Sequence, residues 1–165
     1  MSLVAPGHQE MVYSQSEKIG LPNWSFFTIL VSAKASVPSD QATKMWDFLH
    51  QIVDAFVQER AEQISRDLGL FSGSEGGMQS LDEAAKQAIS NDGLTYSAAE
   101  LTYSQTEVIG LPEKSSVNYL GSSKMLAAPG TELDMFRYLA SSVGRQMFEK
   151  REAIKSNPRP WTITR

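Results

Sequence analysis

The sequence predicts an α+β domain, an internally duplicated ββα unit that forms a four-stranded antiparallel sheet with two long helices on one face. The first observation is a repeat, because YSQSEKIGLP at 13–22 returns as YSQTEVIGLP at 103–112. The second is an alternation of apolar and polar residues after each copy, which is typical of strands. The third is a change to a period near 3.6 farther along each half, which is typical of amphipathic helices.

Sliding the sequence along itself by 90 residues pairs 11–67 with 101–157 without a gap, and 18 of these 57 positions are identical. Known repeat arrays use periods of roughly 20–50 residues and need at least about three copies. Two copies at this wider spacing instead predict a single domain, 1–165, with an internal pseudo-two-fold. Its predicted parts are a first ββα half at 11–67, a flexible linker with a short helix at 68–100, a second ββα half at 101–157 and a tail at 158–165.

The first half begins with a strand predicted at 11–19 and a glycine- and proline-containing turn at 20–23. A second strand is predicted at 26–35, because alternate residues there are apolar and share one face. Those inward residues are Phe27, Ile29, Val31, Ala33 and Ala35. The period then changes, and a long helix is predicted over 39–68, with a serine or an aspartate as its cap.

The linker opens with a glycine- and serine-rich stretch, and a capping box then predicts a short helix over 80–90. The second half repeats the plan, with strands predicted at 101–109 and 115–125 and a helix that Thr131 caps and Pro158 ends. Val117, Tyr119 and Met125 take the inward positions of the last strand.

The 165 residues include no cysteine, which excludes disulfides, zinc–thiolate sites and thiol nucleophiles. The chain does not open with a basic region followed by an apolar run, and no segment approaches the roughly 18 apolar residues of a membrane helix. We therefore expect a soluble protein of the cytoplasm, or of the host cytoplasm if its origin is viral, with no membrane contact.

The formal net charge of −4 is unevenly distributed. The first half carries 5 basic and 7 acidic residues, the linker 1 and 5, and the second half 7 and 6. The basic concentration lies at 145–165, with 6 basic and 2 acidic residues. Proteins that bind polyanions usually have a basic surface, and this sequence predicts one only at its C-terminal end.

Motifs for catalysis or cofactor binding do not emerge from the sequence. The two histidines, His8 and His50, lack partners at metal-ligand spacing, so neither a metal nor a cofactor is expected. The glycines at 73–77 lack the Gly-Lys-Ser/Thr ending of a phosphate loop, and no Gly-x-Ser-x-Gly elbow occurs. Whether the chain is an enzyme stays open, but a non-catalytic protein is favoured.

Glu17 and Glu107 occupy equivalent places in the two copies. A pseudo-two-fold could bring these carboxylates together and shift their pKa values, as in catalytic carboxylate pairs. The alternative, which we favour, is that Tyr-Ser-Gln-x-Glu forms the exposed face of a strand and its turn.

A Leu-Pro-Asn turn at 21–23 followed by the alternating strand at 26–35 resembles the layout of small, uncharacterised hairpin-plus-helix proteins carried by tailed phages. The resemblance covers mainly the first half and carries no catalytic residues across. It implies a virus-like origin and a nucleic-acid context.

Two functions of different classes follow. The favoured one is a non-catalytic binding or assembly module that uses its open sheet face for self-association or for a protein partner, since exposed apolar residues on such a face suit an interface. The alternative is single-stranded nucleic-acid binding, in which aromatic residues stack on bases and basic residues contact phosphates. Its candidate residues are Trp24, Phe26, Lys34, Lys124, Arg145, Arg151 and Arg159. An enzyme of unidentified class is a further alternative.

Two structural predictions can be checked directly. Leu49 and Leu139 occupy equivalent positions on the two helical stripes, so both should be buried in the core. Both copies also keep Gly-Leu-Pro at the turn, which predicts that Gly20 and Gly110 adopt positive φ.

Overall fold

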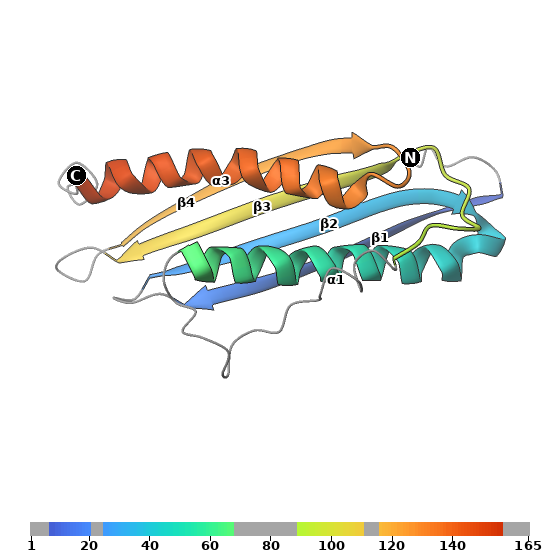
Figure 1. Cartoon of the computed structure of the whole chain (residues 1–165), viewed down its shortest axis with the longest axis horizontal. Coiled ribbons are helices and arrows are strands. Elements are labelled where there is room, and N and C mark those ends of the chain that lie inside the picture. The colour runs from blue at the N-terminus through green and yellow to red at the C-terminus, as the bar shows by residue number, and fades with distance from the viewer. Residues whose placement is uncertain (1–6, 21–24, 68–88, 111–115, 157–165) are drawn as a thin grey trace.

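A computed structural model describes residues 7–20, 25–67, 89–110 and 116–156. It confirms the α+β class and the four-stranded antiparallel sheet, whose strand order is β1-β2-β3-β4 (Figure 1). The elements are β1 (His8–Gly20), β2 (Phe26–Pro38), the short 3₁₀ helix η1 (Ser39–Gln41), α1 (Ala42–Asp67), β3 (Ala99–Gly110), β4 (Ser116–Ala127) and α3 (Glu132–Ser156). Each predicted strand and long helix is therefore present. Six of the eight strand ends lie one to three residues farther out than predicted, β2 begins at the predicted residue, and β4 begins one residue later.

The register of the sheet places odd-numbered residues of all four strands on one face. Tyr13 pairs with Ala33, and Phe27 pairs with Glu107, so odd residues always lie opposite odd residues. On β2 and β3, the two central strands, nearly every odd residue is buried. The even-numbered residues point to the other face, because successive side chains of a strand alternate.

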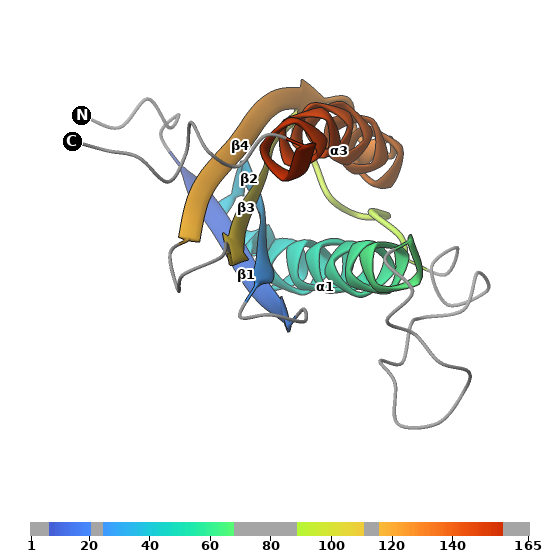
Figure 2. The ribbon, with the colours of Figure 1, turned by 90° about the vertical axis from the view of Figure 1, so that its left-hand side faces the viewer.

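The helices run along the strands that precede them. α1 contacts β1 and β2, and α3 contacts β3 and β4, as Figures 1 and 2 both show. The two helices also meet each other, since Phe56 of α1 stacks on Phe136 of α3 with ring centroids 5.1 Å apart. The core is formed by buried residues of both helices together with odd-numbered residues of the strands.

Both equivalent leucines of the helical stripes are buried, Leu49 with 0% and Leu139 with 2% of its surface exposed. This confirms the prediction that each helix presents an apolar stripe to the core. The helices of 26 and 25 residues are each about 38 Å long at about 1.5 Å per residue. Each therefore extends along almost the full length of its strands.

The prediction of a positive φ at Gly20 is wrong. Gly20 is the last residue of β1, pairs with Phe26 and has no positive φ. Gly110 likewise ends β3, paired with Ser116. The described glycines with positive φ are Gly7, Gly93 and Gly130. The strands thus continue as far as Gly20 and Gly110, and residues 21–24 and 111–115 lie outside the described residues.

Thr131 precedes α3, but its side chain does not cap the helix. Its carbonyl accepts the first helical bond from Met135, while its hydroxyl donates back to the carbonyl of Ala128 at 2.8 Å. The Glu132 carboxylate instead accepts from the Gly130 N–H at 3.0 Å. The predicted short helix over 80–90 and the glycine-rich part of the linker lie outside the described residues, apart from 89 and 90.

The last part of the predicted linker packs against the domain. The Tyr96 hydroxyl donates to Glu132 at 2.6 Å and accepts from Asn91 at 3.1 Å. The Thr95 N–H donates to Gln41 at 2.7 Å. The segment before β3 is therefore held by hydrogen bonds to η1 and to the first residue of α3. None of the described helices is long and apolar enough to cross a membrane.

Candidate binding surfaces

The even-numbered face of the sheet is rich in hydroxyl groups. Two cross-strand pairs, Ser14 with Ser32 and Ser104 with Ser122, each have their oxygens 2.9 Å apart. Further hydroxyl side chains on this face are Ser16, Thr28, Ser36, Thr102, Thr106 and Ser116. The centre of the face can therefore both donate and accept hydrogen bonds.

Large exposed apolar side chains lie among these hydroxyl groups, on both edge strands and on β2. Leu120 and Leu126 on the edge strand β4 are 65% and 69% exposed. Val12 on the opposite edge strand β1 is 53% exposed, and Leu30 on β2 is 39% exposed. Four of the seven large hydrophobic residues that are exposed in the described part of the chain thus lie on this one face.

Lys34 and Lys124, both predicted as binding residues, lie on the even-numbered face and share one carboxylate. The Glu100 oxygens are 3.2 Å from the Lys34 ammonium and 3.5 Å from that of Lys124, and Glu10 is 3.8 Å from Lys34. The hydrogen bond from Lys34 is the main reason that the pKa of the Glu100 carboxyl falls below its usual value. The two lysines are therefore largely balanced by acidic neighbours.

Phe26, the other described candidate on this face, lies at its far end. The Lys18 ammonium is 4.2 Å from the centre of the Phe26 ring, a distance typical of a cation–π contact. Lys34 lies eight positions after Phe26 on β2, which is about 27 Å at about 3.4 Å per residue. Trp24 and Arg159 lie outside the described residues.

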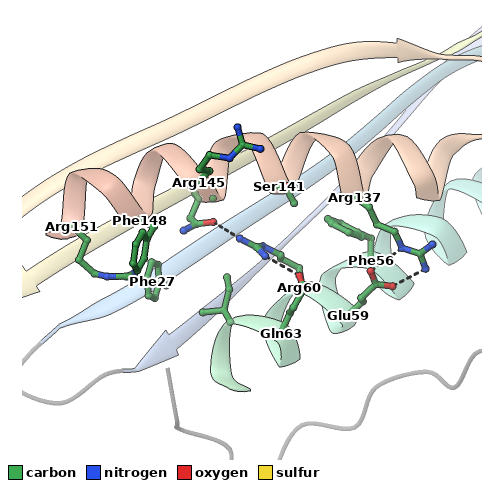
Figure 3. A pocket seen from close by; sticks show the side chains of 14 residues that line it. Phe27, Phe56, Glu59, Arg60, Gln63, Arg137, Ser141, Arg145, Phe148 and Arg151 are labelled. Atoms are coloured by element: carbon green, nitrogen blue, oxygen red, sulfur yellow. Dashed lines mark hydrogen bonds and ion pairs between the residues drawn. The ribbon is translucent and has the colours of Figure 1, made fainter. Parts of the chain in front are cut away.

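A groove of about 740 Å³ lies between α1 and α3 (Figure 3). Its floor is formed by Phe27 of β2 and Gln105 of β3, and its walls by the two helices. The residues that line its walls are Phe56, Glu59, Arg60, Gln63, Ile64, Arg137, Ala140, Ser141, Gly144, Arg145, Phe148 and Arg151. The groove thus combines four guanidinium groups with an apolar lining.

Arg60 crosses this groove from α1 towards β3. Its Nε donates to the Tyr103 hydroxyl at 3.0 Å, and its Nη2 donates to Gln105 Oε1 at 3.3 Å. Its Nη1 donates to Gln63 Oε1 at 2.8 Å. Burial is the main reason that the pKa of Tyr103 lies above its usual value, so this phenol stays neutral at ordinary pH. Every hydrogen-bond partner of Arg60 is therefore uncharged.

Gly144 of α3 makes room for that guanidinium. A Cβ at this position would lie 2.5 Å from Arg60 Nη2, closer than any non-bonded contact allows. In the 90-residue alignment Gly144 takes the place of Asp54, which in the first half accepts a hydrogen bond from Tyr13 at 3.0 Å. The position of α3 next to Arg60 thus carries no side chain, whereas the residue aligned with it in α1 is a carboxylate.

The other arginines of the groove have acidic partners or are exposed. Arg137 forms two hydrogen bonds with Glu59, at 2.9 and 3.0 Å. Arg151 lies between Phe27 and Phe148, 3.6 Å from a Glu107 oxygen, and only 12% of its side chain is exposed. Arg145 is exposed on α3, directed away from α1 (Figure 3).

Glu107 is the most deeply buried carboxylate of the described residues, with 1% of its surface exposed. It accepts a hydrogen bond from the Tyr119 hydroxyl. Burial and this carboxylate together raise the pKa of Tyr119 well above its usual range. Glu17 lies on β1 opposite Ile29, with the whole of β2 between it and Glu107. The structure therefore does not pair the two carboxylates.

The predicted nucleic-acid residues are divided between two faces. Phe26, Lys34 and Lys124 lie on the even-numbered face, whereas Arg145 and Arg151 lie on α3, which contacts odd-numbered residues. Sequence reasoning did not find Arg60, Gln63 or Gln105. Two features of the sequence could have pointed to these residues. Gln105 alternates in step with the inward-facing residues of its strand, and Gly144 stands where the first half has an aspartate.

A smaller cluster lies at the exposed edge of α1. His50 Nδ1 is 2.9 Å from Asp54 Oδ2, and the His50 ring stacks against Tyr13 with centroids 4.5 Å apart. Trp46 meets the Tyr13 ring edge-on at 5.4 Å. His50 is exposed, as expected for a residue at the border of an apolar stripe. Among the described residues, no three metal-ligating side chains come together.

Comparison of the chain with protein-family models, curated proteins and solved structures finds no match. The resemblance to tailed-phage proteins stays a prediction. The even-numbered face and the groove between α1 and α3 are therefore the two candidate binding surfaces.

Proposed function

We propose that this chain is a non-catalytic assembly module that associates with a second copy of itself through the even-numbered face of its sheet. The observation that carries this proposal is the gathering of Val12, Leu30, Leu120 and Leu126 on one face with 39–69% of their surfaces exposed. The register spreads these four side chains over three strands among polar residues, and such a mixture of apolar and hydrogen-bonding groups is typical of protein interfaces.

The proposal includes the layout that leaves this face open, with both helices on the opposite face. The contacts of the helices support it, because each reaches odd-numbered strand residues. From α1, Asp54 bonds to Tyr13 and Arg60 to Tyr103. From α3, Arg151 lies over Phe27. An antiparallel sheet covered in this way has one face that is available to a partner.

The proposal also includes the duplication of a ββα unit. The Tyr13 hydroxyl oxygen lies 2.9 Å from Gln15 Oε1, and the Tyr103 hydroxyl oxygen lies 2.7 Å from Gln105 Oε1, at positions 90 residues apart. The two serine pairs of the even-numbered face, described above, are also related by 90 residues and have the same oxygen separation. Equivalent local contacts on this spacing support a common origin for the two halves.

The size of the face fits a dimer. Strands of 12 or 13 residues are about 40 Å long at about 3.4 Å per residue, and four strands about 4.8 Å apart are about 19 Å wide. The face therefore offers about 760 Å², close to the roughly 800 Å² that each partner buries in an interface of standard size. The central hydroxyl groups would form hydrogen bonds across the contact, directly or through water.

Single-stranded nucleic acid is the alternative occupant of this face. Phe26 could stack on a base, and Lys18, Lys34 and Lys124 could contact phosphates. Glu10 and Glu100 oppose this reading, because they balance two of the three lysines. Binding of a labelled oligonucleotide that weakens steeply with salt would favour it over self-association.

Size-exclusion chromatography with light scattering tests the proposal. The parent should be a dimer at tens of micromolar, and Leu120→Ser with Leu126→Ser should shift it to a monomer. Tyr138→Ser is the matched control, because Tyr138 is 64% exposed on α3, away from the sheet. A parent that is monomeric at high concentration, or a control that dissociates as readily as the leucine variant, would refute the proposal.

A further inference from the structure

We propose that the groove between α1 and α3 is a binding site for a small amphipathic monoanion, a carboxylate head group on an aliphatic or aromatic body. This site lies on the helical side of the molecule and is independent of the sheet face used for self-association. Three features carry the proposal, namely an uncompensated guanidinium, a set of unused N–H donors and an apolar lining.

The guanidinium is that of Arg60. It is half-buried, and within the described part of the chain it forms no ion pair, because its partners are Tyr103, Gln63 and Gln105. A charge removed from water is costly unless an opposite charge compensates it. The Arg60 side chain is also held by three hydrogen bonds, so little freedom is lost when an anion binds. The groove therefore has a fixed positive charge that a ligand can neutralise.

Unused donors surround this charge. Gln63 and Gln105 both accept from Arg60 through Oε1, which directs their amide nitrogens away from it. In the described residues neither Nε2 donates a hydrogen bond, although Gln105 is 3% exposed. Both side chains line the groove, together with the Ser141 hydroxyl. A site that offers several donors and no unoccupied carboxylate is suited to an anion.

One negative charge, rather than several, matches the groove. The guanidinium of Arg137 is occupied by both oxygens of Glu59, and that of Arg151 faces the buried Glu107. Arg145 is exposed and points away from α1 (Figure 3). Only Arg60 therefore remains in the groove as an uncompensated cation. A polyphosphate or a nucleic-acid backbone would need several such charges.

The body of the ligand would lie on apolar side chains. Phe27, Phe56, Ile64 and Phe148 line the groove, and its volume of about 740 Å³ lies within the roughly 300–1,000 Å³ of ligand pockets. Apolar walls with a few polar groups at fixed positions are typical of small-molecule sites. Phe148 is 51% exposed, whereas Phe27 and Phe56 are already buried. The groove thus fits an organic acid better than an inorganic anion, which would leave Phe148 uncovered.

Isothermal titration calorimetry with decanoate and 1-decanol tests this assignment, because the two probes share a chain and differ in charge. The parent should bind decanoate at least tenfold more tightly than 1-decanol. Arg60→Gln should weaken decanoate binding at least tenfold and leave 1-decanol binding unchanged. Lys124→Gln removes the same charge from the other face and should change neither. Equal binding of the two probes by the parent, or an equal effect of the two substitutions, would overturn the proposal.

A second variant keeps the test decisive if Arg60→Gln fails to fold. Ser141 is exposed on α3 and lines the groove without taking part in the Arg60 hydrogen bonds. Ser141→Trp should fill the groove and abolish binding of both probes, with the melting temperature near that of the parent. A folded Ser141→Trp variant that binds decanoate like the parent would show that the groove is not the site.

Discussion

Replacement of Tyr119 by phenylalanine should destabilise the protein far more than the same replacement at Tyr13. Each hydroxyl donates to a carboxylate, Tyr119 to Glu107 and Tyr13 to Asp54. The surroundings differ, since Glu107 is 1% exposed whereas 30% of the Asp54 side chain is exposed. Water can replace the lost donor only at Asp54. The comparison therefore isolates the effect of burial on one type of hydrogen bond.

The magnitudes follow from that difference. A hydrogen bond to a charged group contributes about 1.5–3 kcal/mol, and at Glu107 this one bond is lost while Arg151, 3.6 Å away, still faces the carboxylate. We expect Tyr119→Phe to lower the free energy of unfolding by about 2–3 kcal/mol. Tyr13→Phe should lower it by less than about 1 kcal/mol, because water and His50 continue to satisfy Asp54.

Urea denaturation followed by circular dichroism measures both changes, with the slope m checked for each variant. Equal effects of the two substitutions would refute the reasoning, because they would mean that Glu107 finds another donor as easily as Asp54 does. A larger effect of Tyr13→Phe would show that the more exposed Tyr13–Asp54 bond, and not the buried Tyr119–Glu107 bond, is the critical one.

Three further expectations concern stability and can be measured by chemical and thermal denaturation. Leu49→Ala and Leu139→Ala should each cost about 2–5 kcal/mol, and a parent-like melting curve for either would contradict the core assignment. Gly20→Ala should change stability by less than about 0.5 kcal/mol, because the added Cβ meets nothing within 4 Å. Gly121→Ala should destabilise the protein, because its Cβ would lie 3.0 Å from side chains of α3. A larger loss of stability for Gly20→Ala than for Gly121→Ala would contradict the packing described. The raised pKa of Tyr119 means that its hydroxyl keeps its proton to higher pH in the folded state than in the unfolded state. The free energy of unfolding should therefore fall as the pH rises above about 10. Tyr119→Phe should make this fall less steep.

The strands and helices were predictable because their burial is a local pattern. Alternate apolar residues such as Phe27, Ile29 and Val31 must face one side of a strand, whatever the strand order. The stripe through Leu49 follows the helical period in the same way. Turn geometry was less predictable, because the glycine of Gly-Leu-Pro could end a strand, as Gly20 does, or form the turn itself.

The motif alone did not predict that its second copy is buried, because burial depends on the strand order. The buried residues of that copy are Tyr103, Gln105 and Glu107. The equivalent residues of the first half lie on the edge strand β1 and are half-buried, whereas β3 is central and its copy of the motif is covered. The expectation that Tyr-Ser-Gln-x-Glu forms an exposed face is therefore wrong for the second half. Identical side chains have different surroundings because one strand has a neighbour on each side.

The groove also depends on contacts between distant segments. Arg60 acquires its role because α3 passes close to α1, and because Gly144 leaves space where the first half has Asp54. Neither residue belongs to a recognisable motif. The exposed leucines of β4, Leu120 and Leu126, were missed for a related reason, since an isolated leucine on a strand looks like a core residue until the register is known.

Crosslinking of single-cysteine variants tests self-association through the even-numbered face most directly. The chain has no cysteine of its own, so Ser122→Cys on that face and Ser141→Cys on α3 each introduce one exposed thiol. With a short bismaleimide, Ser122→Cys should give a covalent dimer in high yield, and Ser141→Cys should stay monomeric. Efficient crosslinking through Ser141→Cys together with none through Ser122→Cys would place the contact on the helical side and contradict the account.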